Sequence, residues 1–242
     1  MRPSLFLPPH QKMSIAKEAW PFAVPLVLAS GVALALRYPR TALALFLVGL
    51  LLLAFFRIPK RRFDGPEHLV LAPANGVVTR IDRVEDPAIG QGRMRRIVTF
   101  LSVFDIHVQR SPVSGEVVRS SFRDGLKRAA FREDAGEVNQ SHLVVIRRPS
   151  GDLIGVRQIA GLVARRVVSY LRIGDSPARG DLIGLIKFGS RVDLYLPDQY
   201  RIEVKKGQRL VEGLTIVAAP ATDSPGAAAR DGSKKDRQEV PR

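Results

Sequence analysis

The stretch Lys187-Phe-Gly-Ser-Arg-Val-Asp-Leu-Tyr-Leu-Pro197 contains the step Gly189-Ser190, which by itself predicts only a β-turn between two strands. The same step can react if the turn is strained, because the Ser190 hydroxyl can then attack the carbonyl of Gly189. Glycine on the acyl side gives the least steric resistance and tolerates unusual backbone angles. Elimination from the resulting ester leaves dehydroalanine at position 190, which hydrolyses to a pyruvoyl group. The chain has no cysteine, and this step offers it an electrophilic carbonyl.

The sequence around this step, from Leu69 onward, is typical of β-strands. Short β-branched runs alternate with Gly, Pro and Asp, as in 76–82, 96–103 and 142–147. Residues 159–170 fit a helix or a long strand, and their β-branched valines favour the strand. We expect a mainly-β fold, a flattened β-barrel or sandwich of the hammerhead (lipoyl-like) type.

A weak duplication supports the same fold class. Gly174 and Gly180, six residues apart, precede a short apolar strand predicted at 182–186. Gly207 and Gly213 precede a similar strand at 214–218. After Pro220 the chain has almost nothing to bury, which predicts a disordered tail over 220–242. The domains expected are therefore 1–62, 63–219 and this tail.

Two uncharged apolar segments, 21–36 and 41–56, precede the β region and predict an N-terminal helical hairpin. Each is apolar on all faces, unlike an amphipathic surface helix. Sixteen helical residues reach about 24 Å, short of the roughly 30 Å hydrocarbon core, so the hairpin either dips into the bilayer or just spans it. A cleaved signal peptide is the alternative, but no small-residue cleavage pattern follows the second segment.

The cations around the hairpin predict its orientation. Seven lie in its flanks and two, Arg37 and Arg40, lie between the segments, so both ends are expected on the cytoplasmic face of the cell membrane. The basic flank would attract anionic membrane lipid.

Composition excludes several function classes. The formal charge of +15 admits nucleic acid or an anionic surface, but no basic run is interleaved with aromatics, so no nucleic-acid partner is expected. The four histidines show no ligand spacing, and no metal site is expected.

Three motifs together resemble one enzyme family. The chain resembles the short bacterial form of phosphatidylserine decarboxylase, a pyruvoyl enzyme made as a proenzyme. The similar stretches are residues 188–197, Gln158-Ile-Ala-Gly-Leu-Val-Ala-Arg-Arg166 and Phe104-Asp-Ile-His-Val108. The resemblance covers roughly residues 20 to 219. It implies decarboxylation of phosphatidylserine to phosphatidylethanolamine, a pyruvoyl group derived from Ser190, and a heterodimer of fragments 1–189 and 190–242. It leaves open a further homo-oligomer.

His107 is the second candidate catalytic residue. Strand alternation would put Asp105 and His107 on one face of a strand, with apolar residues on the other. A structural or surface histidine is the ordinary interpretation, but the resemblance implies an active-site histidine here. Such a group can assist the Ser190 hydroxyl or deliver a proton after carbon dioxide leaves.

Asn75 departs from the family pattern, which reads Pro-Ala-Asp-Gly where this chain has Pro73-Ala-Asn-Gly76. Larger bacterial relatives use an aspartate at this turn in self-cleavage. Three interpretations stay open: Asn75 only caps the turn, another carboxylate such as Asp105 replaces the aspartate, or Asn75 deamidates.

Arg165 and Arg166 are candidate contacts for the substrate phosphate or carboxylate. An arginine pair is more often a solvated face.

A rival hypothesis from another class is a non-catalytic membrane-anchored lipoyl-like β-domain that acts as a binding or adaptor module. Asn75 favours it, because a member that had lost self-processing could persist as a binding module.

Overall fold

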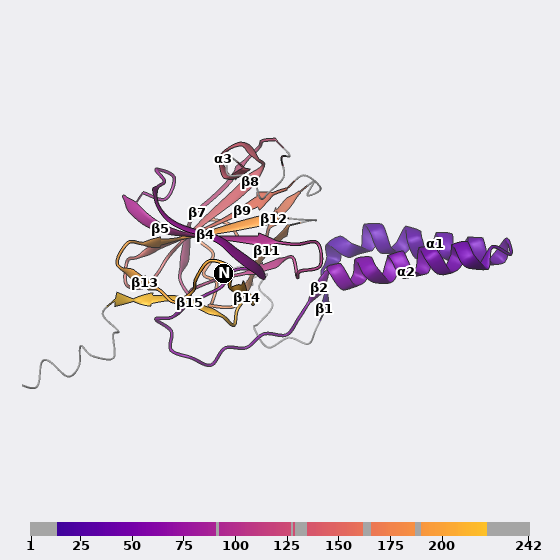
Figure 1. The fold of residues 1–242 in the computed structure, drawn as a ribbon, viewed down its shortest axis with the longest axis horizontal. Helices are drawn as coiled ribbons and strands as arrows, with labels where there is room; N and C mark the ends of the chain where they lie inside the picture. The colour runs from indigo at the N-terminus through magenta and orange to yellow at the C-terminus, as the bar shows by residue number, and fades with distance from the viewer. Residues whose placement is uncertain are drawn as a thin grey trace, which may run out of the picture.

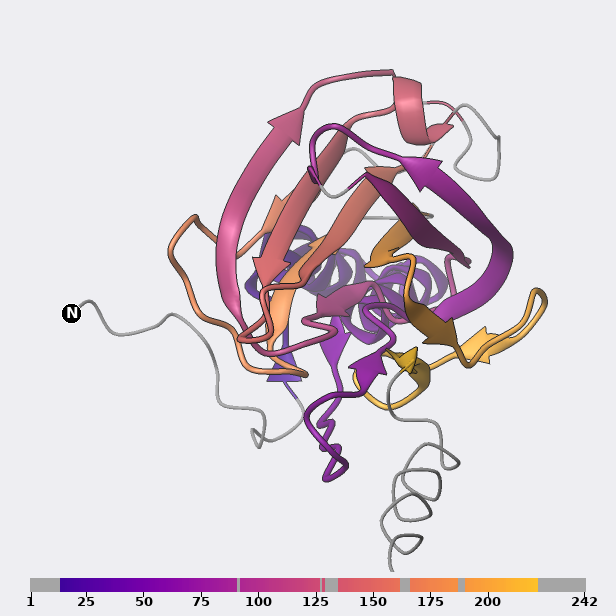
Figure 2. The ribbon, with the colours of Figure 1, turned by 90° about the vertical axis from the view of Figure 1, so that its left-hand side faces the viewer.

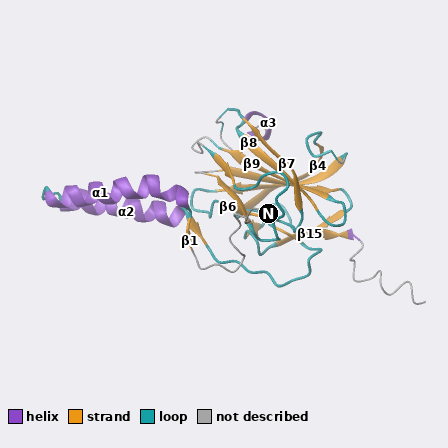
Figure 3. Ribbon diagram, turned by 180° about the vertical axis from the view of Figure 1, so that it is seen from behind, coloured by secondary structure: helices purple, strands orange, loops and turns teal. Residues whose placement is uncertain are grey.

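The computed structural model describes residues 14–90, 92–126, 128, 135–161, 166–186 and 190–221. The N-terminal part is a helical hairpin that projects from one end of a β-rich domain (Figures 1 and 3). Its helices are α1 (Trp20–Ala35) and α2 (Pro39–Phe55), preceded by the short 3₁₀ helix η1 (Lys17–Ala19). A two-stranded sheet of β1 (Ser14–Ile15) and β2 (Arg57–Ile58) lies at its base. The predicted hairpin is confirmed to within two residues at each helix end.

Only one helical run, Lys17–Ala35, is both long and apolar enough to cross a membrane within the described part of the chain. The second helix is apolar but shorter. Most of the apolar side chains of both helices are exposed, as expected for a hairpin whose surroundings are apolar.

Three more sheets make up the β domain. A seven-stranded sheet has the order β14-β4-β5-β12-β9-β8-β7, and two three-stranded sheets have the orders β10-β11-β6 and β13-β15-β3. The strands are β3 (Val70–Leu71), β4 (Gly76–Glu85), β5 (Arg93–Leu101), β6 (Val108–Arg110), β7 (Glu116–Arg123), β8 (Ser141–Arg147), β9 (Leu153–Ala160), β10 (Val167–Ser169), β11 (Leu182–Ile186), β12 (Ser190–Pro197), β13 (Tyr200–Ile202), β14 (Arg209–Leu210) and β15 (Ile216–Pro220), with one short helix, α3 (Ala135–Val138).

The mainly-β prediction is confirmed, although the sheets do not close. The seven-stranded sheet curves strongly (Figure 2), but its outer strands β14 and β7 do not pair with each other. The described strands therefore form packed open sheets, and of the two forms expected they match the sandwich rather than the closed barrel.

The single long strand predicted over 159–170 is wrong. β9 ends at Ala160 in the seven-stranded sheet, and β10 begins at Val167 in a three-stranded sheet. The β-branched residues identified the extended conformation correctly, but local preference does not specify which sheet a segment joins.

The glycines of the duplication have a clear role. Gly174, Gly180, Gly207 and Gly213 all have positive φ, between 68° and 90°, a backbone conformation that other residues rarely adopt. Each glycine is the third residue of a turn of its own, closed by a backbone hydrogen bond from the residue that follows it. The repeat thus encodes two similar pairs of turns, one before β11 and one before β15.

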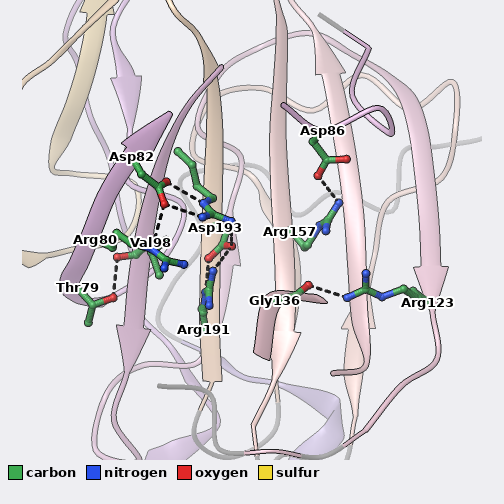
Figure 4. A network of polar contacts seen from close by, with 11 residues as sticks. Thr79, Arg80, Asp82, Asp86, Val98, Arg123, Gly136, Arg157, Arg191 and Asp193 are labelled. Atoms are coloured by element: carbon green, nitrogen blue, oxygen red, sulfur yellow. Dashed lines mark hydrogen bonds and ion pairs between the residues drawn. The ribbon is translucent and has the colours of Figure 1, made fainter. Parts of the chain in front are cut away.

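Strand β12 is the centre of the large sheet. It pairs with β5 on one side and β9 on the other, and all eight of its residues are buried. Val192, Leu194 and Leu196 belong to the main hydrophobic core. The residues between them point to the other face, where Arg191 and Asp193 form a buried ion pair with two hydrogen bonds of 2.7 Å (Figure 4).

We expect Asp193→Asn to lower the free energy of unfolding by about 3–5 kcal/mol, because it removes the buried negative charge that accepts two hydrogen bonds from the Arg191 guanidinium. The measurement is thermal or urea unfolding in detergent. The matched control is Asp64→Asn, which removes the exposed Arg62–Asp64 pair and should change stability little. Equal effects of the two variants would contradict the assigned role of the buried pair.

A second apolar cluster joins the hairpin to the β domain. Its buried members come from the hairpin base, from the segment around β6 and from β11: Ala16, Ala19, Phe55, Phe56, Ile106, Val108, Leu182 and Leu185. Because these side chains are shared between the two parts, the hairpin base is fixed against the end of the domain that carries the N-terminal end of β12.

Candidate active site

Ser190 is the first residue of β12, and the sheet holds its backbone from both sides. It pairs with Leu101 at the end of β5 and with Ala160 at the end of β9. Its side chain is wholly buried, and its Oγ has no hydrogen-bond partner among the described residues. A buried hydroxyl without a partner costs free energy and calls for an explanation, and a role in self-cleavage would supply one at this position. Gly189, the other half of the predicted cleavage site, lies outside the described residues.

The imidazole of His107 is also buried and incompletely bonded. Its Nδ1 lies 2.8 Å from the backbone carbonyl oxygen of Asp105, and its ring centroid lies 4.3 Å from that of Phe55 in α2. Nε2 has no partner in the described part of the chain. Nδ1–H donates to the carbonyl, so Nε2 carries the lone pair. Burial lowers the pKa of His107 to about 4, so the ring is neutral at pH 7.

The chain brings these two groups to the same end of the domain. The amide of Ile186 donates a hydrogen bond of 3.1 Å to the carbonyl of His107, and Ile186 precedes Ser190 by only four residues. From the other direction, Leu101 pairs with Ser190, and His107 follows six residues later. A buried hydroxyl and a neutral imidazole nitrogen, both without hydrogen-bond partners among the described residues, therefore occur at the end of the domain where β12 begins.

Asp105 acts on His107 through its backbone. Its carboxylate accepts hydrogen bonds of 2.8 Å from the amide and from the hydroxyl of Ser102, and it pairs with Arg209. The prediction that Asp105 and His107 share the face of a strand is wrong, because these bonds close a turn and β6 begins only at Val108. The turn orients the backbone carbonyl of Asp105 so that it accepts the hydrogen bond from Nδ1 of His107.

Asn75 is buried in the turn before β4, and its described contact is with the C-terminal part of the chain. Its Oδ1 accepts a 3.2 Å hydrogen bond from the amide of Glu212. The Glu212 carboxylate is buried between Arg61, at 3.3 Å, and Arg110, at 4.0 Å. Burial raises the pKa of Glu212, and the two guanidinium groups oppose that shift. Sequence reasoning missed this carboxylate because it lies 137 residues from Asn75 in the chain.

Comparison with known proteins gives the family. The family model for phosphatidylserine decarboxylase matches residues 48–218. The chain belongs to the phosphatidylserine decarboxylase family. Among its relatives, the phosphatidylserine decarboxylase proenzyme of Symbiobacterium thermophilum is 40% identical over 205 residues, covering 84% of this chain and 94% of the relative. That of Erythrobacter litoralis is 39% identical, with 85% and 87% covered. That of Saccharopolyspora erythraea is 43% identical, with 68% and 71% covered.

The described structure does not support the prediction that Arg165 and Arg166 contact the substrate. Arg165 lies outside the described residues, and Arg166 is exposed. A contact between either guanidinium and the substrate phosphate or carboxylate stays a prediction.

A buried chain of amides behind His107 was missed by the sequence reasoning. Gln158 donates through Nε2 to Oε1 of Gln109 at 2.7 Å, and Gln109 donates through Nε2 to the carbonyl oxygen of His107 at 2.8 Å. Both glutamines are fully buried. Gln158 opens one of the three family motifs, which was the available signal, but a single glutamine does not reveal that its partner lies on β6. These bonds fix the backbone that carries the imidazole.

We expect Asn75→Asp to test whether a carboxylate at this turn matters in this decarboxylase. If self-cleavage needs one, Asn75→Asp should cleave faster than the parent, because a carboxylate stabilises a nearby developing positive charge better than an amide does. In the serine-protease triad the Asp-to-Asn change costs about 10⁴ in rate, which sets an upper guide.

The measurement follows cleavage of freshly translated parent, Asn75→Asp and Asn75→Gln on denaturing gels. Asn75→Gln cannot follow the ready deamidation route of an Asn-Gly step, so it separates deamidation from an intrinsic role of the amide. Equal rates in all three would leave Asn75 as a turn residue that bonds the Glu212 amide.

Proposed function

We propose that this chain is a proenzyme that cleaves itself between Gly189 and Ser190 and then decarboxylates phosphatidylserine to phosphatidylethanolamine and carbon dioxide. The observation that carries the proposal is the buried, unpartnered Ser190 hydroxyl at the start of the central strand, in a chain that belongs to this family. A non-catalytic adaptor is not favoured, because the relatives that match most of the chain are proenzymes.

Self-cleavage uses groups of the chain itself. The Ser190 Oγ adds to the Gly189 carbonyl as its proton passes to a base, and the peptide nitrogen leaves to give an ester. Elimination then releases the Gly189 carboxylate, and water replaces the former amide nitrogen, which departs as ammonia. His107 fits the role of base, because its Nε2 lone pair is neither protonated nor bonded within the described structure.

The pyruvoyl group at position 190 fits the site. The strand holds residue 190 between β5 and β9, and the buried space there contains a hydroxyl that makes no other bond. When formed, the group supplies an electron sink for the substrate's amine-bearing carbon as carbon dioxide leaves. The protein would hold that carbon near His107, exclude water through the surrounding apolar residues, and pass a proton through Nε2, whose lone pair must first take that proton up because the ring is neutral at pH 7.

The hairpin supports the proposal that this chemistry takes place at a membrane. One helical run is compatible with membrane crossing by length and composition. Cations at the hairpin base, Lys17, Arg57 and Lys60 among them, outnumber Arg37 and Arg40 at the other end, which supports attachment to the cytoplasmic face. Anionic phosphatidylserine would be enriched near such a base.

Intact-mass analysis of the purified protein tests the proposal. We expect two pieces, 1–189 and 190–242, with the smaller one lighter by one ammonia than its sequence requires and resistant to amino-terminal sequencing. The same sample should convert phosphatidylserine in mixed micelles. A single unmodified chain of 26.7 kDa that persists after long incubation would contradict the proposal and revive the adaptor hypothesis.

A further inference from the structure

The most exposed large apolar side chain in the described structure is Phe104. It is 81% exposed, more than any lipid-facing residue of the hairpin, and its neighbour Val103 is 48% exposed. A single exposed apolar residue is ordinary, so exposure alone carries no conclusion. The exposure becomes informative together with the structure of the turn that holds these residues and the position of that turn.

The turn from Ser102 to Asp105 holds both side chains outward. The amide of Asp105 donates to the carbonyl of Ser102 at 3.0 Å, which makes Val103 and Phe104 the two central residues of a β-turn. The Asp105 carboxylate takes both the amide and the hydroxyl of Ser102, and Arg209 holds that carboxylate from outside. Because these bonds already order the turn, the two apolar side chains lose little further entropy on binding.

The turn leaves the domain at the base of the hairpin. Ile106, one residue after the turn, belongs to one apolar cluster with Phe55, the last residue of α2, and Phe56, and the His107 ring contacts Phe55 in a tilted arrangement. Figure 1 shows that the hairpin projects from this end of the domain.

The hairpin base has the composition of a membrane interface. Trp20, at the first residue of α1, is 52% exposed, and Lys17, just before α1, and Lys60, just after β2, are exposed as well. Tryptophan and basic side chains are enriched at the level of the lipid headgroups. A bilayer that holds the hairpin would meet the domain at this level.

We propose that Val103 and Phe104 form a second membrane contact, which inserts into the headgroup region of the bilayer that holds the hairpin and keeps the Ser190–His107 site against that surface. This inference rests on the proposed membrane attachment of the hairpin. We assign a lipid surface as the partner of Val103 and Phe104, because the turn lies next to the base of an apolar hairpin with basic flanks. Two contacts with the bilayer would fix the tilt of the domain, so that a lipid headgroup reaches the site without the lipid leaving the bilayer.

Tryptophan quenching by brominated lipid tests the contact in the full chain. The parent has one tryptophan, Trp20, which reports insertion of the hairpin. In a Trp20→Phe background, Phe104→Trp places the probe on the turn. The control is Glu85→Trp, because Glu85 is exposed and pairs with Arg93, at the opposite end of β5 from the turn.

In vesicles of phosphatidylglycerol and brominated phosphatidylcholine, we expect quenching of Trp20 and of the tryptophan at 104, and none at 85. Quenching at 20 with none at 104 overturns the second contact and leaves membrane attachment intact. No quenching at 20 overturns attachment and this contact together. Protection of position 104 from both brominated lipid and aqueous iodide would show a protein contact instead, and would also overturn the inference.

Activity gives a second readout. Phe104→Asp should raise the apparent KM for phosphatidylserine in vesicles about tenfold, as expected for partial loss of one buried aromatic side chain. Its rate with a soluble short-chain phosphatidylserine should equal that of the parent. An equal loss with both substrates would show that Phe104 acts in the site and does not bind the membrane.

Discussion

Replacing Ser190 with alanine is expected to abolish both self-cleavage and decarboxylation. The acyl shift needs an oxygen on the side chain of residue 190, and without it neither the ester nor the pyruvoyl group can form. The purified variant should remain a single chain of 26.7 kDa under conditions in which the parent is fully cut. Gel electrophoresis measures the loss of cleavage, intact mass the absence of the pyruvoyl group, and release of carbon dioxide the loss of decarboxylation.

The fold of this variant should be intact, so the loss can be assigned to chemistry. The Ser190 Oγ makes no hydrogen bond within the described structure, and its removal leaves no partner unsatisfied. The melting temperature should therefore equal or slightly exceed that of the uncut parent. Ser150→Ala, at an exposed turn, is the matched control and should be cleaved normally. Cleavage of Ser190→Ala at position 189 would show that another nucleophile acts.

Replacing His107 with glutamine is expected to slow the reaction by about 10² to 10⁴, the usual contribution of a positioned acid or base. Glutamine is preferred to alanine, because the imidazole packs on Phe55 and its removal would leave a cavity. Cleavage is followed in fresh translate, and decarboxylation is expressed per molecule of cleaved protein. If cleavage and turnover match the parent, His107 is structural.

Stability against pH provides an independent readout of the same residue. Burial lowers the pKa of His107 to about 4, below the ordinary value of about 6.5 for an unfolded chain. The unfolded state therefore binds a proton first as pH falls, and the free energy of unfolding should decline between about pH 6.5 and pH 4. His107→Gln should show a shallower decline. Burial also lowers the pKa of His142, which is why part of the decline remains in the variant.

Local sequence patterns predicted what local physical chemistry determines. The apolar segments gave the helices, because residues apolar on every face exclude a water-exposed helix surface. The paired glycines marked positive-φ turns, and the β-branched runs marked strands. The nucleophile candidate Ser190 and the histidine candidate His107 came from motifs that are continuous in the sequence.

What the sequence could not give depends on pairings between distant segments. Three contacts at the site join residues far apart in the chain. They are the hydrogen bond from the Glu212 amide to Asn75, the pairing of Arg209 with Asp105, and the hydrogen bond between Gln158 and Gln109. The packing of Phe55 on His107 is the clearest case. A helix read as a membrane anchor also forms one wall of the site, and no periodicity within the helix indicates this.

The position of Ser190 at the start of a central strand has a consequence for reassembly. Cleavage before Ser190 would put β12, β13, β14 and β15 on the small fragment, while β12 stays hydrogen-bonded to β5 and β9 of the large one. The two pieces would then separate only if the sheets unfold. Unfolding of the mature protein would follow first-order kinetics, but refolding would require two chains to meet and would depend on concentration. The uncut chain would refold in a one-chain step that does not depend on concentration, so we expect folding to precede cleavage.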